Sequence, residues 1–381
     1  MLVALLAATL SLSEARALAD RRNGALLAAQ AGVDVASAGV EVAGQLANPT
    51  LTASYGKDDP KLLVGMDVRM PIFGQRGAAI ASAEAQKGVA EADAQVERAK
   101  LHAAVRRAFS ASWAAAEQAK VAAEAAGIAA ELADLAAQKL RMGSAAQIEV
   151  EQSLLASRRS AQDKLDREAE ALATRRELEA TVGVAVETLQ APPRSDAPPE
   201  DELLRRAQSH PELQALRWQQ EVALKKADEE RAAIRPLPTV SVIAQRYEDP
   251  AVSFGLRGGI AFDVPLLSLN RGRVHEQEQT AHRARLQAQA TAQRLAGQVR
   301  AARERWAAAS TRATFYGGAF LESAHRVLEM ARAGYRIGRT SLIAVLQAQN
   351  DLASANSRAL DATLDAQKAL ADLEEAIGAD L

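Results

Sequence analysis

The chain has 381 residues, with 46 basic and 48 acidic side chains and a net charge of −2. This balance excludes the clustered basic surface that nucleic-acid binding needs. Cysteine is absent, which excludes disulfides, thiol nucleophiles and thiolate metal sites. Apolar residues make up 48% of the chain but aromatic residues only 3%. The composition therefore favours long alanine-rich helices over one thick globular core.

The chain opens with the apolar segment MLVALLAATL, which lacks the basic residues that begin a secretory signal. We interpret residues 1–13 either as the remnant of a signal peptide or as the first turn of a helix. No apolar run approaches the roughly 20 residues that a membrane-spanning helix needs. Any part of the chain that crosses a membrane should therefore consist of strands.

The sequence contains an internal repeat, with two copies of one unit. Gly143 recurs as Gly338, and Gly183 recurs as Gly378, both at a separation of 195 residues. Such a constant offset predicts two tandem structural repeats. We place the first repeat at residues 14–183 and the second at 202–381, with a proline-rich linker at 184–201.

Each repeat is predicted to contain helices and two short strands in the same order. The first has an alanine-rich helix over 14–47, strands at about 49–56 and 61–70, a long helix over 76–143 and a helix over 144–183. The second has a helix over 202–236, strands at about 238–247 and 252–264, a long helix over 271–338 and a helix over 339–378. Helices this long predict coiled-coil packing.

Heptad spacing in the long helices indicates the coiled-coil seam. In the first repeat the seam residues are Val121, Ile128, Leu135 and Met142. In the second repeat they are Tyr316, Phe320, Val327, Met330 and Ile337. We expect these side chains to face neighbouring helices.

The segment VSFGLRGGIAFDV, residues 252–264, alternates strictly between apolar and mostly small or polar residues. Successive side chains of a strand point to opposite faces, so this pattern gives one apolar and one wet face. Such a strand suits lipid on one side and water on the other, although a soluble hairpin packed on one face is the alternative. The aromatic residues expected at the membrane interface are Tyr55, Phe73, Tyr247, Phe254 and Phe262.

Together these motifs resemble the TolC-type outer-membrane efflux channels over nearly the whole chain. The resemblance rests on NPTLTASYG, MPIFGQRGA, HPELQAL and, most specifically, YRIGRTSLIAVLQAQNDLASA. PIFGQRG and VPLLSLNRGR look closest to the heavy-metal branch. The resemblance implies a mainly α fold with a small β part, which trimerises into a 12-stranded β-barrel and an α-helical tunnel.

The resemblance also implies partners and a location. It indicates a homotrimer in the outer-membrane lipid of a Gram-negative bacterium, extending into the periplasm. The other partners would be a periplasmic adaptor protein and an inner-membrane efflux pump of the resistance-nodulation-division type. The assembly would conduct metal ions or small toxic compounds, without a cofactor and without enzymatic chemistry.

By the same resemblance, the helix turns at Gly143 and Gly338 form the periplasmic tip, where the adaptor docks. The expected docking residues are Arg141, Gly143, Ser144, Ala145, Arg336, Gly338, Arg339 and Thr340. Ordinary capping of a helical hairpin is the alternative explanation for these residues.

The family narrows its tunnel with acidic rings just beyond the second tip, where this chain has Ala344 and Gln347. That ring is therefore absent or moved. Glu149, just beyond the first tip, would supply one carboxylate per chain, and three such charges close together would repel one another and attract cations. We take Glu149 and Gln347 as candidate pore-constriction residues, against the alternative of a solvated helix face.

Neither metal-binding nor catalytic motifs stand out in the sequence. The five histidines, at positions 102, 210, 275, 282 and 325, lack ligand spacing, and we interpret each as a helix-surface residue. Two other readings stay open, a periplasmic adaptor and a soluble coiled-coil scaffold. An enzyme ranks behind both of them.

Overall fold

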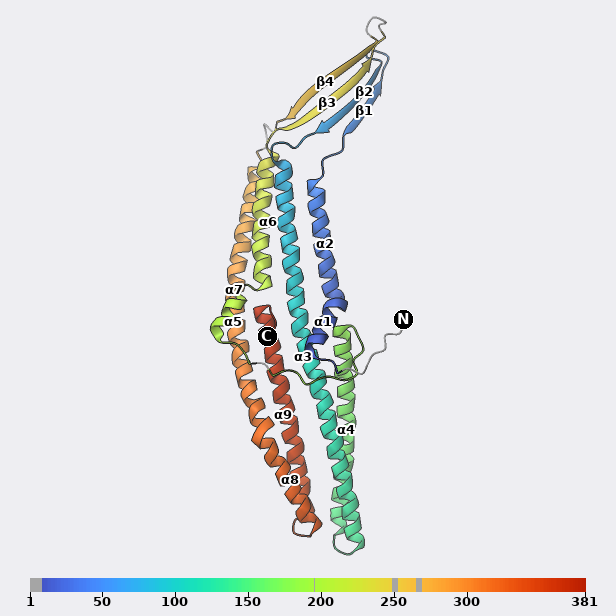
Figure 1. Cartoon of the computed structure of the whole chain (residues 1–381), viewed down its shortest axis with the longest axis vertical. Helices are drawn as coiled ribbons and strands as arrows, with labels where there is room; N and C mark the ends of the chain where they lie inside the picture. Colours follow the sequence, from blue (N-terminus) through green and yellow to red (C-terminus); the bar gives the residue numbers. More distant parts are fainter. Residues whose placement is uncertain (1–8, 195, 249–252, 265–268) are drawn as a thin grey trace. The chain divides into compact units, whose positions relative to one another are not determined.

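The computed structural model describes residues 9–194, 196–248, 253–264 and 269–381, and they form long helices and one small sheet (Figure 1). This confirms a mainly α fold with a small β part. The helices are α1 (Leu12–Arg22), α2 (Gly24–Gly44), α3 (Gln75–Arg141), α4 (Gln147–Val182), α5 (Glu200–Ala207), α6 (Pro211–Ala233), α7 (Arg271–Phe315), α8 (Leu321–Arg336) and α9 (Leu342–Ile377), with the π-helical segment η2 (Tyr316–Phe320) between α7 and α8. The strands are β1 (Thr50–Tyr55), β2 (Leu62–Arg69), β3 (Leu237–Arg246) and β4 (Phe254–Asp263).

The chain divides into two compact units that run across the sequence repeats. Unit 1 comprises Met1–Leu27, Glu97–His210 and Arg294–Leu381, and unit 2 comprises Ala28–Val96 and Pro211–Gln293. Each unit takes material from both repeats, because the long helices α3 and α7 pass through both units. The repeat boundaries themselves stay a prediction.

Unit 2 contains a four-stranded antiparallel sheet in the order β1-β2-β3-β4. Leu51 pairs with Met66, Met66 with Val242, and Val242 with Gly258. Residues paired in this way lie on one face, so the predicted alternation extends across all four strands. β1 and β4 each keep one edge without a partner strand among the described residues.

The two faces of the sheet differ in chemistry. Leu256 and Ile260 on the apolar face are 71% and 67% exposed, and no described part of the chain covers them. The exposed large apolar residues of that face are Leu51, Tyr55, Leu62, Val64, Met66, Val242, Phe254, Leu256, Ile260 and Phe262, and Arg246 is a charged exception on it. The other face carries Thr52, Asp67, Ser241, Gln245, Arg257 and Asp263, with Leu63, Leu237, Ile243 and Ala261 as apolar exceptions.

In the middle of unit 1 a hydrophobic core joins α1, α3, the end of α4 and the segment after it. Phe109 and Val105 of α3 are fully buried there, against Leu178 and Val182 of α4. Residues 10–12 belong to this folded region, since Leu10 pairs with the backbone beside Leu189 and Leu12 is buried. The expectation of a signal remnant otherwise concerns residues 1–8, which lie outside the described residues.

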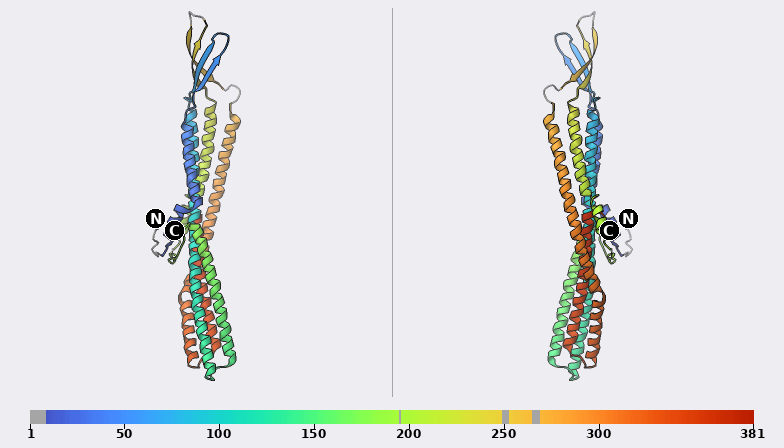
Figure 2. Two further views of the ribbon diagram at one scale, coloured as in Figure 1. Left: turned by 90° about the vertical axis from the view of Figure 1, so that its right-hand side faces the viewer. Right: turned by 90° about the vertical axis from the view of Figure 1, so that its left-hand side faces the viewer.

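The lower part of unit 1 consists of α3, α4, α8 and α9 (Figures 1 and 2). Its core contains Leu132 of α3, Leu328 and Tyr335 of α8, and Leu342 and Val345 of α9. Each hairpin, α3–α4 and α8–α9, reverses at a glycine. The four helices therefore pack as long antiparallel neighbours.

The first helix of each repeat is broken, contrary to the prediction of continuous helices over 14–47 and 202–236. Asn23 adopts an extended conformation between α1 and α2, and its side-chain oxygen accepts hydrogen bonds from the backbone N–H groups of Ala25 and Leu26. The second break precedes Pro211, because proline disfavours helical geometry in the residue before it.

The long helix of the second repeat is also interrupted, at η2, where Gly318 has φ −105° and ψ −126°. The predicted seam was wrong beyond this point. Leu328 and Tyr335 are buried, whereas Val327 and Met330 are 48% and 67% exposed. The π segment explains the difference, since its wider turn breaks the heptad register of the residues that follow.

At the helix tips the predicted seam fails for a different reason. Met142 and Ile337 are 72% and 67% exposed. Each lies in the last turn before the reversal, where a facing helix no longer covers it. Ile128 and Leu135, higher on α3, do pack against the buried core of the lower part.

One described helix, α2, is long and apolar enough to cross a membrane by length and composition, with a mean hydropathy of 1.3 in its most apolar window. We had expected no such segment from the sequence. It carries Asp34 and Glu41, and only 6% of that window is buried. Length and composition alone are weak evidence for a membrane span.

Candidate functional site

The two helix tips are built by the same backbone motif. Gly143 and Gly338 have φ values of +71° and +77°, which glycine adopts without a steric penalty. The N–H groups of Ser144 and Arg339 each donate to a carbonyl five residues back, at 2.8 Å in both cases. These are Schellman motifs, which end a helix and reverse the chain. The expectation of a positive φ at both glycines is confirmed.

Both tips expose a basic residue, an apolar residue and the reversing glycine in sequence. Arg141, Met142 and Gly143 form the first set, and Arg336, Ile337 and Gly338 form the second. Ile148 and Ile343, in the first turn of the following helices, are 64% and 60% exposed. Of the other expected docking residues, Ser144 and Arg339 are exposed, and Ala145 and Thr340 are half-buried.

Sequence reasoning missed the apolar part of this surface. The residues concerned are Met142, Ile148, Ile337 and Ile343. Their occurrence at the same 195-residue offset as the glycines was the available signal. We had assigned Met142 and Ile337 to the buried seam instead.

The two tips are connected through Lys139 and Tyr335. The Lys139 ammonium donates to the Tyr335 carbonyl at 2.5 Å and lies 3.9 Å from the centre of the Tyr335 ring. The Tyr335 side chain is buried, and its hydroxyl has no hydrogen-bond partner among the described residues. Burial, with a smaller contribution from the Glu149 carboxylate, raises the pKa of Tyr335.

The candidate pore residues differ in their surroundings. Glu149 is half-buried near the start of α4, whereas Gln347 is exposed on α9 and Ala344 is half-buried. The structure contains one chain, so the part played by these residues in a pore stays a prediction.

The expected interface aromatics occupy two rows of the sheet and the loop beside it. Tyr55 and Phe254 lie in one row across the strands, through the pairs Tyr55–Leu62, Leu62–Arg246 and Arg246–Phe254. Phe262 pairs with Pro238 near the other end of β3 and β4. Phe73, 43% exposed, follows β2.

Tyr247 is placed differently from the other aromatic residues. Its hydroxyl donates to the Gln245 side chain at 2.7 Å. Its ring lies beside Gly255, where an added Cβ would come within 3.1 Å of a ring carbon. Gln245 and Gly255 pair with each other on the polar face of the sheet, so this position favours the wet side for Tyr247.

A buried ionic cluster in unit 1 joins the two repeats, and sequence reasoning did not anticipate it. Arg106 of α3 donates from Nε and Nη2 to the two oxygens of Glu374 on α9, both at 2.8 Å. Arg16 of α1 donates to the same carboxylate at 2.5 Å. Gln367 accepts from Arg106 at 3.0 Å and donates to the Pro193 carbonyl of the linker. Helices of both repeats therefore meet at Glu374, and the linker joins the same cluster through Gln367.

Beside this cluster, His102 lies between two carboxylates. Its Nε2 is 2.8 Å from Asp20 of α1, and its Nδ1 is 3.0 Å from both oxygens of Asp380 near the end of the chain. Burial alone would lower the pKa of His102, but the hydrogen bonds with Asp380 and Asp20 raise it above its usual value. With a carboxylate at each nitrogen, the ring fits the protonated form, which donates from both.

Two of the histidines correct the expectation of surface positions. His102 and His210 are 8% and 5% exposed. His210 directly precedes Pro211, the first residue of α6, and its Nε2 lies 3.0 Å from the Glu375 carbonyl oxygen. His275, His282 and His325 are exposed or partly exposed on helices. No group of three or more metal-ligating side chains occurs among the described residues.

The fold and these sites define a repeat-built helical protein with a sheet that is apolar on one face, the class of outer-membrane channels. A family model for the outer membrane efflux protein matches residues 15–184 and 204–379. The chain belongs to this family. It is the outer-membrane channel component of an efflux system, located in the outer membrane of a Gram-negative bacterium and extending into the periplasm. Members of the family are channels rather than enzymes.

Solved structures share the fold at low sequence identity. The channel CusC has 17% identity and a TM-score of 0.77, with 97% of this chain and 92% of that chain covered. VceC, an outer membrane protein of Vibrio cholerae, has 17% identity and a TM-score of 0.74, covering 97% and 96%. The CmeC outer membrane channel of Campylobacter jejuni has 15% identity and a TM-score of 0.77, covering 99% and 90%. No match was found among curated protein sequences.

Proposed function

We propose that three copies of the chain form one efflux duct, with a shared 12-stranded barrel in the outer membrane and a tunnel of helices in the periplasm. The observation that carries this proposal is the four-stranded sheet of unit 2. Among the described residues nothing covers its apolar face, and its two outer strands, β1 and β4, each keep an open edge. A membrane-spanning sheet needs every edge paired, and pairing β4 of one copy with β1 of the next achieves this.

The helices of unit 1 support the same arrangement. At the level of Gln118, α3 contacts both α4 and α9, because Gln118 accepts from Arg167 of α4 at 2.9 Å and donates to Asp361 of α9 at 2.7 Å. One turn further along α9, Asp365 pairs with Arg312 of α7 at 3.5 Å. At this level the side-chain contacts link α4 to α3, α3 to α9 and α9 to α7, so α4 and α7 are the first and last helices of this series. Contact between the ends of successive copies closes such a series into a ring.

The tips are the proposed docking surface for a periplasmic adaptor, which connects the duct to an inner-membrane pump. The support is the paired surface of Arg141, Met142, Arg336 and Ile337, in which an apolar side chain is flanked by a cation at each tip. Apolar residues rimmed by charge are typical of protein interfaces. Ser144, Ala145, Arg339 and Thr340 complete the surface.

The cargo would be metal ions or small toxic compounds that the pump delivers. The likeness of PIFGQRG and VPLLSLNRGR to the heavy-metal branch supports metal ions as the cargo class. Glu149 and Gln347 are proposed to line the narrow part of the tunnel near the tips. A ring of Glu149 carboxylates would favour cations over anions.

Conductance across a planar lipid bilayer tests this proposal. The purified protein is expected to form discrete channels whose preference for cations falls in Glu149→Gln. Adaptor docking is tested separately, by pull-down of a periplasmic adaptor with Arg141→Glu and Arg336→Glu variants, which should lose binding. A protein that forms no channels in the bilayer would contradict the duct.

A further inference from the structure

Three aromatic side chains gather on the second repeat where its long helix is interrupted. The ring centres of Phe315, Tyr316 and Phe320 lie 5.2, 5.5 and 5.7 Å apart in the three pairings. We call these three residues the aromatic ridge. Phe315 is 60% exposed and Phe320 is 38% exposed, so the ridge faces away from the core of its own chain.

The backbone departs from the α-helix at the place where these rings meet. In an α-helix, residues five apart point about 140° away from each other. Here the π-helical segment with its kink at Gly318 brings the rings of Phe315 and Phe320 to one side instead. Gly318, with its non-helical φ and ψ, lies between Phe315 and Phe320. The π segment therefore creates the ridge, and single-turn π segments frequently occur at functional positions.

The level of the ridge along the helices follows from three side-chain contacts within unit 1. Arg312, one turn before Tyr316, pairs with Asp365 of α9. Asp361, one turn before Asp365 in α9, accepts from Gln118 of α3, and Gln118 accepts from Arg167 of α4. The ridge, Asp361, Gln118 and Arg167 therefore lie at about one level.

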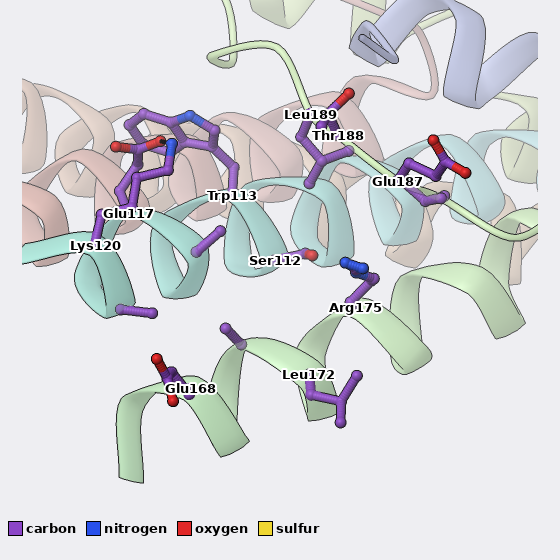
Figure 3. Close-up of a pocket in the computed structure, with 14 residues that line it drawn as sticks. Ser112, Trp113, Glu117, Lys120, Glu168, Leu172, Arg175, Glu187, Thr188 and Leu189 are labelled. Atoms are coloured by element: carbon purple, nitrogen blue, oxygen red, sulfur yellow. Dashed lines mark hydrogen bonds and ion pairs between the residues drawn. The ribbon is translucent and has the colours of Figure 1, made fainter. Parts of the chain in front are cut away.

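An apolar stripe occurs on α4 at this same level. Leu165 and Leu172, two turns apart on one face of the helix, are 58% and 54% exposed. Leu165 lies two residues from Arg167. Leu172 also borders a groove of about 440 Å³ beside Trp113 of α3 (Figure 3). No described part of the chain covers the two leucines.

The ridge and the stripe lie at the two ends of the series of linked helices, α7–η2 and α4. A rotation axis along the tunnel relates copies without shifting them along the axis, so elements at one level in a chain stay at that level in the next copy. Closing the ring brings the ridge of one copy toward the stripe of its neighbour. Both are apolar, and both are uncovered in the isolated chain.

We propose that the ridge of Phe315, Tyr316 and Phe320 packs against Leu165 and Leu172 of a second copy of this chain, and so fastens the tunnel between adjacent copies. This inference rests on the proposed trimer and adds the residues that hold its helices together. Burial of the aromatic and leucine side chains supplies the attraction. The π segment would then serve this contact, because it brings the three aromatic rings together into one surface that faces the neighbouring copy.

Disulfide cross-linking tests the contact, and the absence of native cysteine makes the introduced pair unambiguous. The test variant is Leu165→Cys with Phe320→Cys, oxidised in the detergent-extracted particle and separated on a non-reducing gel. The matched control is Leu154→Cys with Phe320→Cys. Leu154 is also partly exposed on α4, but it lies eleven residues from Leu165, about 16 Å along the helix.

The expected result is conversion of most test chains into covalent dimers and trimers, with few in the control. Light scattering could show a three-chain particle while the test variant forms no cross-link, or while the control cross-links equally. Either result would overturn the ridge contact and leave the trimer intact. If a different protein, and not a second copy of this chain, shielded the Phe320→Cys thiol from a thiol reagent, the ridge contact would be overturned in the same way. A one-chain particle would overturn the trimer itself.

As a second measurement, Phe315→Ala and Phe320→Ala should lower the temperature at which the particle dissociates into single chains. The control is Val327→Ala, which removes another exposed apolar side chain further along α8. Equal dissociation temperatures for the ridge variants and the parent would contradict the contact.

Discussion

The Arg106 guanidinium and the Glu374 carboxylate form a two-pronged ion pair with side chains that are only 1% and 2% exposed. Arg106 belongs to the first repeat and Glu374 to the second, 268 residues apart. Arg16, Gln367 and the backbone of Leu381 complete the hydrogen bonds of the pair. A buried charge is tolerated only when it is paired in this way.

The Glu374→Gln variant should therefore be strongly destabilised. It leaves the buried Arg106 charge without its carboxylate, whereas Arg16 keeps Asp380 at 3.3 Å. Breaking a buried pair costs about 3–5 kcal/mol. The free energy of unfolding in denaturant measures the loss. The control is Asp372→Asn, two residues away, whose pair with Arg107 is about 40% exposed and should contribute at most about 1 kcal/mol. Equal effects of the two variants would contradict a special role for the buried pair.

The contribution of His102 to stability should depend on pH with a definite sign. The pKa of His102 is raised in the folded protein, so the folded state binds the proton more tightly than the unfolded chain. Its contribution is complete below the ordinary histidine pKa of about 6.5 and disappears as the pH rises through the folded value. Burial would raise the pKa values of Asp20 and Asp380, but both are lowered, Asp20 by its hydrogen bonds with Arg98 and His102, and Asp380 by its hydrogen bond with His102 and the charge of Arg16. Their contribution is lost as the solution becomes strongly acidic.

His102→Gln should therefore lose most stability, relative to the parent, between about pH 4 and pH 6.5. The difference in unfolding midpoint should shrink at higher pH. Titration of the parent by NMR should show a folded His102 pKa above that of an unfolded peptide. His275→Gln, which alters an exposed histidine on α7, is the control and should show no such profile.

Gly88 of α3 should not tolerate even a methyl group. An added Cβ would lie 2.5–2.8 Å from three atoms of the Trp218 ring on α6, within unit 2. Gly88→Ala should cost about 1–3 kcal/mol by overpacking. Gly127→Ala on the same helix is the control, because nothing lies within 4 Å of its added Cβ. That variant should gain about 0.5–1 kcal/mol by helix propensity. Thermal unfolding of the two variants side by side distinguishes them, and a neutral Gly88→Ala would disprove the close α3–α6 approach.

The two faces of the sheet should respond differently to an introduced charge. Val242→Arg places a guanidinium on the apolar face and should cost about 2–4 kcal/mol if that face meets lipid. Ser241→Arg, the adjacent residue on the polar face, should be tolerated. The amount of each variant recovered in the outer-membrane fraction measures the difference. Equal recovery would contradict a lipid-facing surface.

Local periodicity explains which parts of this structure the sequence could predict. The strand alternation around Leu256 and the chain reversals at Gly143 and Gly338 depend on residues close together in the chain, and all were found. The Arg106–Glu374 pair and the His102 site depend on contacts between distant segments, which one sequence does not reveal. The break at Asn23 and the π segment at Gly318 were missed although each lies at a dipeptide that favours a break, Asn23-Gly24 and Gly317-Gly318, because the long helical pattern on both sides was taken as continuous.

The central claim is that three chains share one barrel and one tunnel. The most direct test is the mass of the detergent-extracted particle from an outer-membrane fraction, measured by light scattering with the detergent contribution subtracted. The account predicts a mass near three chains. A particle of one or two chains that is released without detergent would contradict it.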